Sequence, residues 1–138
     1  MMPKIAPTSR VLIVDDELLI RWALREVLEA KGYLVSEAGT AASARSAMVA
    51  TGAIPDAVVL DYRLPDSNDL VLLTAIRQES PATPVIMMTA YGTAEMIRDA
   101  LELGAFRVVN KPFEVHEMAD LVASALGQGE GCVGGRVY

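Results

Sequence analysis

The 138-residue chain has one cysteine and one histidine, and it lacks any long apolar run. The single thiol, Cys132, excludes a disulfide within the chain and a metal cluster built on cysteine. No apolar stretch approaches the roughly 18 residues that cross a bilayer, and the first ten residues contain no apolar core of a signal peptide. We therefore expect a cytoplasmic location and no membrane partner.

The chain also lacks an excess of positive charge. Twelve lysines and arginines stand against 18 aspartates and glutamates, so the formal net charge is −6. This balance argues against direct binding of nucleic acid or of an anionic membrane by the chain itself. Hydrophobic residues make up 52% of the chain, which is enough to bury a core in a folded domain.

Short apolar runs alternate with longer amphipathic stretches along the chain. The runs predict strands at residues 11–14, 34–38, 57–60, 84–88 and 106–109. The spacing of apolar residues between them predicts helices at 17–31, 41–50, 69–79, 94–103 and 115–126. Expected helix N-caps are Thr40, Asn68 and Thr93, and expected helix stops are Gly32 and Gly104.

Five βα units predict an α/β fold with a parallel sheet and right-handed crossovers. Three of the runs are apolar almost throughout, as strands are when helices cover both faces of a parallel sheet. We expect an extension at residues 1–9, one domain at 10–126 and a glycine-rich tail or linker at 127–138. In such a sheet, the functional site lies at the carboxyl ends of the strands.

Polar side chains follow four of the five predicted strands. Asp15 and Asp16 follow the first strand, Asp61 the third, Thr89 the fourth and Lys111 the fifth. Each residue alone has a structural explanation, because an aspartate or threonine after a strand often caps a helix or begins a turn. Together they predict one site at one edge of the sheet.

Three carboxylates without a histidine are the ligands of a hard cation such as Mg²⁺, which prefers oxygen. The cation would offset the repulsion between the adjacent Asp15 and Asp16. Lys111 adds a positive charge, and Thr89 adds a hydroxyl donor. Such a set can stabilise a phosphoryl group in transfer, with Asp61 as the nucleophile that becomes an aspartyl phosphate.

Four motifs carry a resemblance to a known family. The segments "VLIVDDE", "VVLDYRLP", "MMTAYG" and "NKPF" resemble the receiver domain of two-component response regulators, over Val11 to about Leu126. The resemblance implies a flavodoxin-like fold, a doubly wound sheet of five parallel strands in the order 2-1-3-4-5 with five helices. It also implies phosphoryl transfer to Asp61 from a sensor histidine kinase.

The family's functional residues match positions of this chain. Those matching the Mg²⁺ ligands are Asp15, Asp16, Asp61 and, through its backbone carbonyl, Arg63. Thr89 and Lys111 match the residues that contact the phosphoryl oxygens. The resemblance implies no enzymatic turnover beyond Mg²⁺-dependent self-phosphorylation from phosphodonors and slow autodephosphorylation.

Two further segments, "IRWALREVLEAKGY" and "GAFRVVNKPFE", resemble the receivers of nitrogen-regulatory, enhancer-binding activators. This implies an output in transcription regulation and a possible homodimer through the face formed by the fourth and fifth helices. A ring ATPase and a helix-turn-helix domain cannot fit after Leu126, so we expect an excised or stand-alone receiver. Trp22, on the first helix, is interpreted as a packing residue or a contact of this subclass.

The chain departs from the family at two positions. Asp69 replaces a glycine that the family usually has eight residues after the phosphorylated aspartate. Val108 replaces the Tyr or Phe that many receivers carry three residues before the lysine and that turns inward on activation. A degenerate receiver that acts only as a protein-docking module therefore remains an alternative.

Two other functions are disfavoured. Phosphohydrolases that form an aspartyl phosphate need a carboxylate two residues after the nucleophile, where this chain has Arg63. Domains that bind nucleotide or flavin share the doubly wound pattern, but the chain has neither a GxGxxG turn nor a GxxxxGK[ST] loop.

Overall fold

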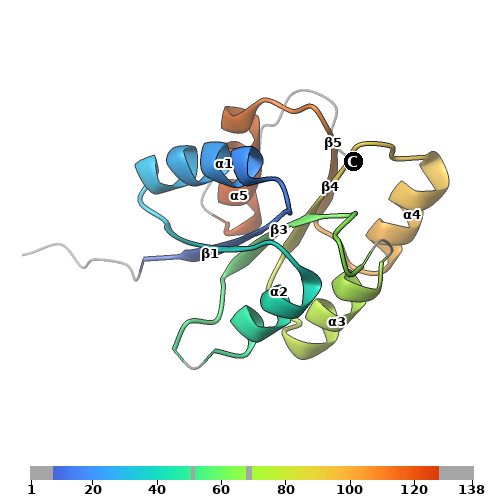
Figure 1. Cartoon of the computed structure of the whole chain (residues 1–138), viewed down its shortest axis with the longest axis horizontal. Coiled ribbons are helices and arrows are strands. Elements are labelled where there is room, and N and C mark those ends of the chain that lie inside the picture. The colour runs from blue at the N-terminus through green and yellow to red at the C-terminus, as the bar shows by residue number, and fades with distance from the viewer. Residues whose placement is uncertain (1–7, 51, 68–69, 128–138) are drawn as a thin grey trace, which may run out of the picture.

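A five-stranded parallel sheet lies between two layers of helices in the computed structural model (Figure 1). The structure describes residues 8–50, 52–67 and 70–127. The strand order is β2-β1-β3-β4-β5, as predicted. Most of the predicted extension, most of the predicted tail with Cys132, and the positions of Asn68 and Asp69 lie outside the described residues.

The elements alternate strictly along the chain. The strands are β1 (Arg10–Val14), β2 (Leu34–Ala38), β3 (Ala57–Asp61), β4 (Val85–Thr89) and β5 (Arg107–Asn110). The helices are α1 (Leu18–Ala30), α2 (Ala41–Met48), α3 (Val71–Glu79), α4 (Ala94–Glu102) and α5 (Val115–Ala125). Strand bounds differ from the predicted ones by at most one residue and helix bounds by at most two.

Helix ends follow the expected capping residues in most cases. The side chain of Thr40 accepts a hydrogen bond from the amide of Ser43, and that of Thr93 accepts one from the amide of Met96. Gly32 and Gly104, which follow α1 and α4, have φ angles of 96° and 103°, a region that residues with a side chain avoid. Helix α3 has Leu70 at its N-cap position, without a side-chain cap.

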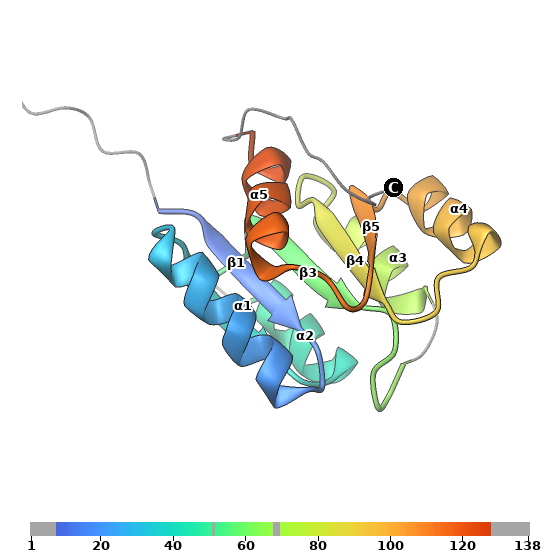
Figure 2. The same cartoon turned by 90° about the horizontal axis from the view of Figure 1, so that it is seen from above.

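Two apolar layers hold the helices on the sheet. Helices α1 and α5 lie side by side on one face, with Leu24, Leu28 and Met118 in their layer, and α2, α3 and α4 cover the other face (Figure 2). Strands β3 and β4 are buried at every position, which is why their sequences are apolar up to the last residue.

Parallel pairing aligns the carboxyl ends of the strands. Asp61, the last residue of β3, is in register with Met88, and Thr89, the last residue of β4, is in register with Asn110. Polar residues at these positions therefore meet at one edge of the sheet. Across the described part of the chain, no helix has the length and apolar character to cross a membrane.

Candidate functional site

The five residues predicted from the strand ends converge in the structure. Asp16, Asp61, Thr89 and Lys111 line a cavity of about 190 Å³ at the carboxyl edge of the sheet. Asp15 lies beneath them, with no exposed surface, and Thr89 is 2% exposed. Residues far apart in the sequence thus form one polar site within an otherwise apolar part of the sheet.

Lys111 is the cation of this site. Its Nζ donates a hydrogen bond to Asp15 Oδ2 at 2.9 Å and lies 3.3 Å from Asp61 Oδ2. Burial lowers the pKa of Lys111, but the hydrogen bond to Asp15 and the charge of Asp61 outweigh burial and raise it above its ordinary value. The ammonium group is therefore charged at neutral pH, and it offsets part of the carboxylate repulsion.

Asp61 carries the most perturbed carboxyl group of the site. Burial and the nearby charge of Asp15 raise its pKa from 3.8 to about 6, although Lys111 and the Arg63 amide act in the opposite direction. The Arg63 amide is 3.5 Å from Asp61 Oδ1, a long contact for a hydrogen bond. At neutral pH Asp61 is therefore largely ionised, but Lys111 and the Arg63 amide offset only part of the cost of its negative charge. A carboxyl group perturbed in this way is typical of a functional site.

The donor set fits a hard divalent cation. Asp15, Asp16 and Asp61 each offer a carboxylate oxygen, and these oxygens lie within 4.8 Å of one another. Among the described residues, this is the one group of three or more metal-ligating side chains. Carboxylate oxygens alone suit Mg²⁺. The cluster therefore could hold a metal at the position that the sequence predicted.

Thr89 and Val108, the residues at the two positions expected to take part in a switch, have different surroundings. Thr89 Oγ1 accepts a hydrogen bond from the Tyr91 amide at 3.3 Å, so the hydroxyl is tied to the loop that leads into α4. Tyr91 itself is 80% exposed, whereas Val108 is fully buried. No aromatic ring stands at the Val108 position to turn inward, as the sequence indicated.

Sequence reasoning missed one acidic residue of the site. Glu17 Oε1 lies 3.4 Å from Lys111 Nζ, and the Glu17 amide donates to Asp15 Oδ1 at 2.8 Å. The segment "DDE" contained the signal, because three acidic residues in a row before a helix offer a third carboxylate to the same cation. Glu17 is 61% exposed, which places its charge at the mouth of the cavity.

The exposure of Trp22, on α1, shows that its interpretation as a packing residue was wrong. Trp22 is 60% exposed, and the neighbouring Leu18 and Leu19 are 68% and 79% exposed. Trp22 therefore does not pack in the core. The interpretation of Trp22 as a contact of the subclass stays a prediction.

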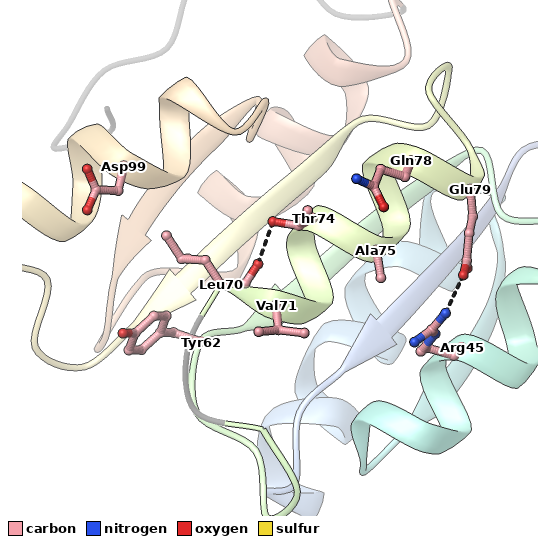
Figure 3. A pocket seen from close by; sticks show the side chains of 9 residues that line it. All are labelled: Arg45, Tyr62, Leu70, Val71, Thr74, Ala75, Gln78, Glu79 and Asp99. Atoms are coloured by element: carbon pink, nitrogen blue, oxygen red, sulfur yellow. Dashed lines mark hydrogen bonds and ion pairs between the residues drawn. The ribbon is translucent and has the colours of Figure 1, made fainter.

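A larger hollow of about 660 Å³ runs along α3 (Figure 3). Tyr62 and Asp99 lie toward one end of it, and Arg45 and Glu79 form an ion pair at the other. The charges of that pair neutralise each other. We therefore place the candidate functional site in the smaller cavity, where the carboxylates that could hold a metal and the ammonium group of Lys111 converge.

The chain matches the family model described as response regulator receiver domain over residues 11–123. The chain belongs to this receiver family. The receiver is 36% identical over 118 residues to sporulation initiation phosphotransferase F of Bacillus subtilis, a match that covers 86% of this chain and 94% of that protein. It is 38% identical over 119 residues to regulatory protein AtoC of Escherichia coli, with 86% of this chain and 25% of that protein covered.

A third relative of the receiver is the DNA-binding transcriptional regulator NtrC of Escherichia coli, 34% identical over 116 residues, with 84% of this chain and 24% of that protein covered. The receiver thus spans about a quarter of the length of AtoC and of NtrC. These matches are consistent with the predicted enhancer-binding subclass.

Solved structures agree with this fold. The receiver superposes on a CheY-like receiver domain protein from Methanospirillum hungatei with a TM-score of 0.82 and 27% identity, covering 88% of this chain and 96% of that one. It superposes on the beryllofluoride-activated NtrC4 receiver domain dimer with a TM-score of 0.77 and 30% identity, covering 86% and 97%. The predicted flavodoxin-like fold is confirmed.

The raised pKa of Asp61 predicts a pH-dependent loss of stability in the receiver. Since its pKa is higher in the folded state than the ordinary 3.8, the folded state binds the proton more tightly, and stability falls as the pH rises from about 4 to about 6. Asp61→Asn should remove this loss. A pKa rise from 3.8 to about 6 corresponds to a stability loss of up to about 3 kcal/mol.

Urea unfolding with a chelator, at pH 7.5 and pH 4.0, measures the effect. Asp61→Asn should be more stable than the wild type at pH 7.5, and the difference should shrink toward pH 4.0. Asp120→Asn, which removes an exposed carboxylate of α5, is the control for net charge. Equal stability of Asp61→Asn and wild type at pH 7.5 would contradict the prediction.

Proposed function

We propose that this chain is the phospho-acceptor receiver of a two-component phosphorelay, in which Asp61 accepts a phosphoryl group from a sensor histidine kinase. The observation that carries the proposal is the placement of Asp61. Its carboxylate lies 3.3 Å from Lys111 Nζ, beside Asp15 and Asp16 in a cavity lined by Thr89. A nucleophile, a cation and a hydroxyl donor meet at one point.

The transfer is a substitution at phosphorus. An oxygen of Asp61 forms the new bond to phosphorus, and the bond from phosphorus to the histidine nitrogen breaks. The leaving imidazole keeps the electron pair, and a proton on its other nitrogen lets it leave as a neutral group. Lys111 and the Thr89 hydroxyl donate to the phosphoryl oxygens, where negative charge is held during the transfer.

Asp15, Asp16 and Asp61, with the backbone carbonyl of Arg63, would hold Mg²⁺, which when bound would supply positive charge that stabilises the transferred phosphoryl group. Lys111, whose Nζ lies 3.3 Å from Asp61 Oδ2, is placed to donate to a phosphoryl group carried by Asp61. Hydrolysis of the acyl phosphate returns the carboxylate, so the chain acts as a switch with slow autodephosphorylation and not as an enzyme with turnover.

The output that we propose is transcription regulation, carried out by other domains or by a partner. Two relatives, AtoC and NtrC, are a regulatory protein and a DNA-binding transcriptional regulator, and the chain's net charge of −6 disfavours direct nucleic-acid binding. We also propose a homodimer through the face of α4 and α5; similarity to a receiver domain dimer supports dimer formation. The reaction would take place in the cytoplasm, where the kinase domain obtains ATP.

The first prediction of the proposed function concerns covalent phosphorylation of Asp61. Acetyl phosphate or phosphoramidate with Mg²⁺ should add one phosphoryl group to the wild type, and Asp61→Asn should add none, because the amide cannot act as the nucleophile. Intact mass measures the addition. Hydroxylamine should remove the group quickly, since an acyl phosphate is a reactive mixed anhydride.

Asp99→Asn, which changes a carboxylate of the larger hollow, is the matched control and should be phosphorylated as the wild type is. An unchanged mass of the wild type with both donors would refute the phospho-acceptor function and favour the docking module.

The second prediction concerns the metal. Mg²⁺ at ten times its dissociation constant should stabilise the folded state by about 1.4 kcal/mol, which raises the Tm by roughly 3–6 °C. Asp16→Ala should weaken this response, because one ligand is gone. Its metal-free Tm should stay at or above that of the wild type, since removal of the exposed Asp16 charge relieves repulsion.

Thermal unfolding across a Mg²⁺ series, with Asp99→Ala as control, measures both effects. A Tm of the wild type that does not respond to Mg²⁺ would exclude the proposed metal site.

The third prediction concerns signalling. Beryllofluoride with Mg²⁺, which mimics the phosphoryl group, should change amide hydrogen exchange chiefly across residues 89–113. With Val108 in place of an aromatic switch residue, the change has to pass through the Thr89 hydroxyl and its contact with the Tyr91 amide. Thr89→Ala should therefore suppress the exchange change while Asp61 still reacts with phosphoramidate, and Thr89→Ser should retain it.

Amide hydrogen exchange that is the same with and without beryllofluoride, in wild-type protein shown to bind it, would mean that phosphorylation does not signal through residues 89–113.

A further inference from the structure

Arg21, a residue of α1 outside the cavity, contacts the backbone of the proposed metal site. Its Nη1 donates a hydrogen bond to the Asp15 carbonyl oxygen at 2.6 Å. Its Nε donates to Glu37 Oε1 at 2.9 Å. The guanidinium group therefore joins the turn after β1 to the side chain of a residue on the neighbouring strand β2, and its side chain is only 18% exposed.

Every polar group of Asp15 takes part in a hydrogen bond. Its amide donates to the Ala38 carbonyl at 3.0 Å, and its carbonyl accepts from Arg21. Its two carboxylate oxygens accept from the Glu17 amide and from Lys111 Nζ. Since Asp15 is fully buried, each of these contacts restricts the direction in which the carboxylate, and the adjacent Asp16, can point.

The surroundings keep the Arg21 guanidinium in place. Glu37 is also bound by Arg25 through Nη1; although burial raises the pKa of Glu37, the hydrogen bonds from Arg25 and Arg21 outweigh burial and lower it. Gly39 leaves the necessary space, because a Cβ there would lie 3.3 Å from Arg21 Nη1 and 4.0 Å from the Asp15 carbonyl oxygen. The guanidinium thus fills a slot between two strand ends.

We infer that Arg21 is a positioning residue: it fixes the turn between β1 and α1, and so sets Asp15 and Asp16 in the geometry that receives a divalent cation. This inference rests on the proposed function, since it concerns the proposed Mg²⁺ site. A planar fork with two donors suits this role, because it binds the carbonyl and the carboxylate at the same time. Partners that orient metal ligands commonly change metal affinity by 10-fold or more.

The test compares two arginines that share one partner. Arg21→Gln removes the donor to the Asp15 carbonyl, whereas Arg25→Gln removes the other arginine of Glu37 and leaves that donor in place. Titration of the full chain with MgCl₂, followed by amide chemical shifts, should give a dissociation constant roughly tenfold higher in Arg21→Gln and less than about twofold higher in Arg25→Gln. The phosphorylation rate with phosphoramidate at saturating Mg²⁺ should stay within about twofold of wild type in Arg25→Gln.

A second readout needs no metal. Hydrogen exchange of the Glu17 amide, which donates to Asp15 Oδ1, should be faster in metal-free Arg21→Gln than in metal-free Arg25→Gln. If the wild type failed to respond to Mg²⁺, the proposed function would fail, while this readout would still decide whether Arg21 orders the turn. Equal exchange in the two variants would overturn the inference.

Two further variants keep the test decisive if Arg21→Gln does not fold. Arg21→Lys retains the charge but cannot bind both partners through one fork, so its dissociation constant should lie between those of wild type and Arg21→Gln. Gly39→Ala crowds the guanidinium without deleting a polar group, and it should also weaken Mg²⁺ binding. A Mg²⁺ dissociation constant unchanged in Arg21→Lys and Gly39→Ala, or raised equally in Arg25→Gln, would show that Arg21 serves the stability of α1 and not the site.

Discussion

The ammonium group of Lys111 is the positive charge that makes a buried cluster of carboxylates tolerable. Its Nζ lies within 3.4 Å of oxygens on Asp15, Glu17 and Asp61, and Asp15 has no exposed surface at all. Without a cation these carboxylates would repel one another and resist burial. Even with Lys111 in place, the pKa of Asp61 is raised to about 6, so the compensation is incomplete. A divalent cation at the three aspartates, as proposed above, would complete this compensation.

The parallel sheet brings this cluster together at the ends of its strands. Parallel strands end at the same edge of the sheet, and the apolar layers on both faces hold β1, β3 and β4 in place. The loops add orientation. Arg21 binds the turn after β1, and Asp66, in the loop after β3, accepts hydrogen bonds from the Ala41 and Ala42 amides at the start of α2. Two loops of the site, those after β1 and β3, are therefore tied to β2 and to the start of α2, although β2 itself contributes no residue to the cavity.

Much of this protein was predictable from its sequence. The apolar runs indicated the strands to within one residue, because a strand buried on both faces has no polar position until it reaches the edge of the sheet. The polar residues after those runs indicated the site for the same reason. The resemblance to receiver domains then named the fold and the roles of Asp61, Thr89 and Lys111; the fold is confirmed, and the roles remain proposals.

What the sequence by itself determined was the order of the elements and the edge at which Asp15, Asp61, Thr89 and Lys111 meet. Only the tertiary structure decided how their charges are shared. Lys111 and Asp15 are 96 residues apart in the chain, and no local pattern encodes the contact of Lys111 with Glu17, the reach of Arg21 to the Asp15 carbonyl, or the exposure of Trp22. Apolar periodicity depends on neighbours along one element, whereas a pKa or a side-chain contact depends on groups that several elements bring into one small volume.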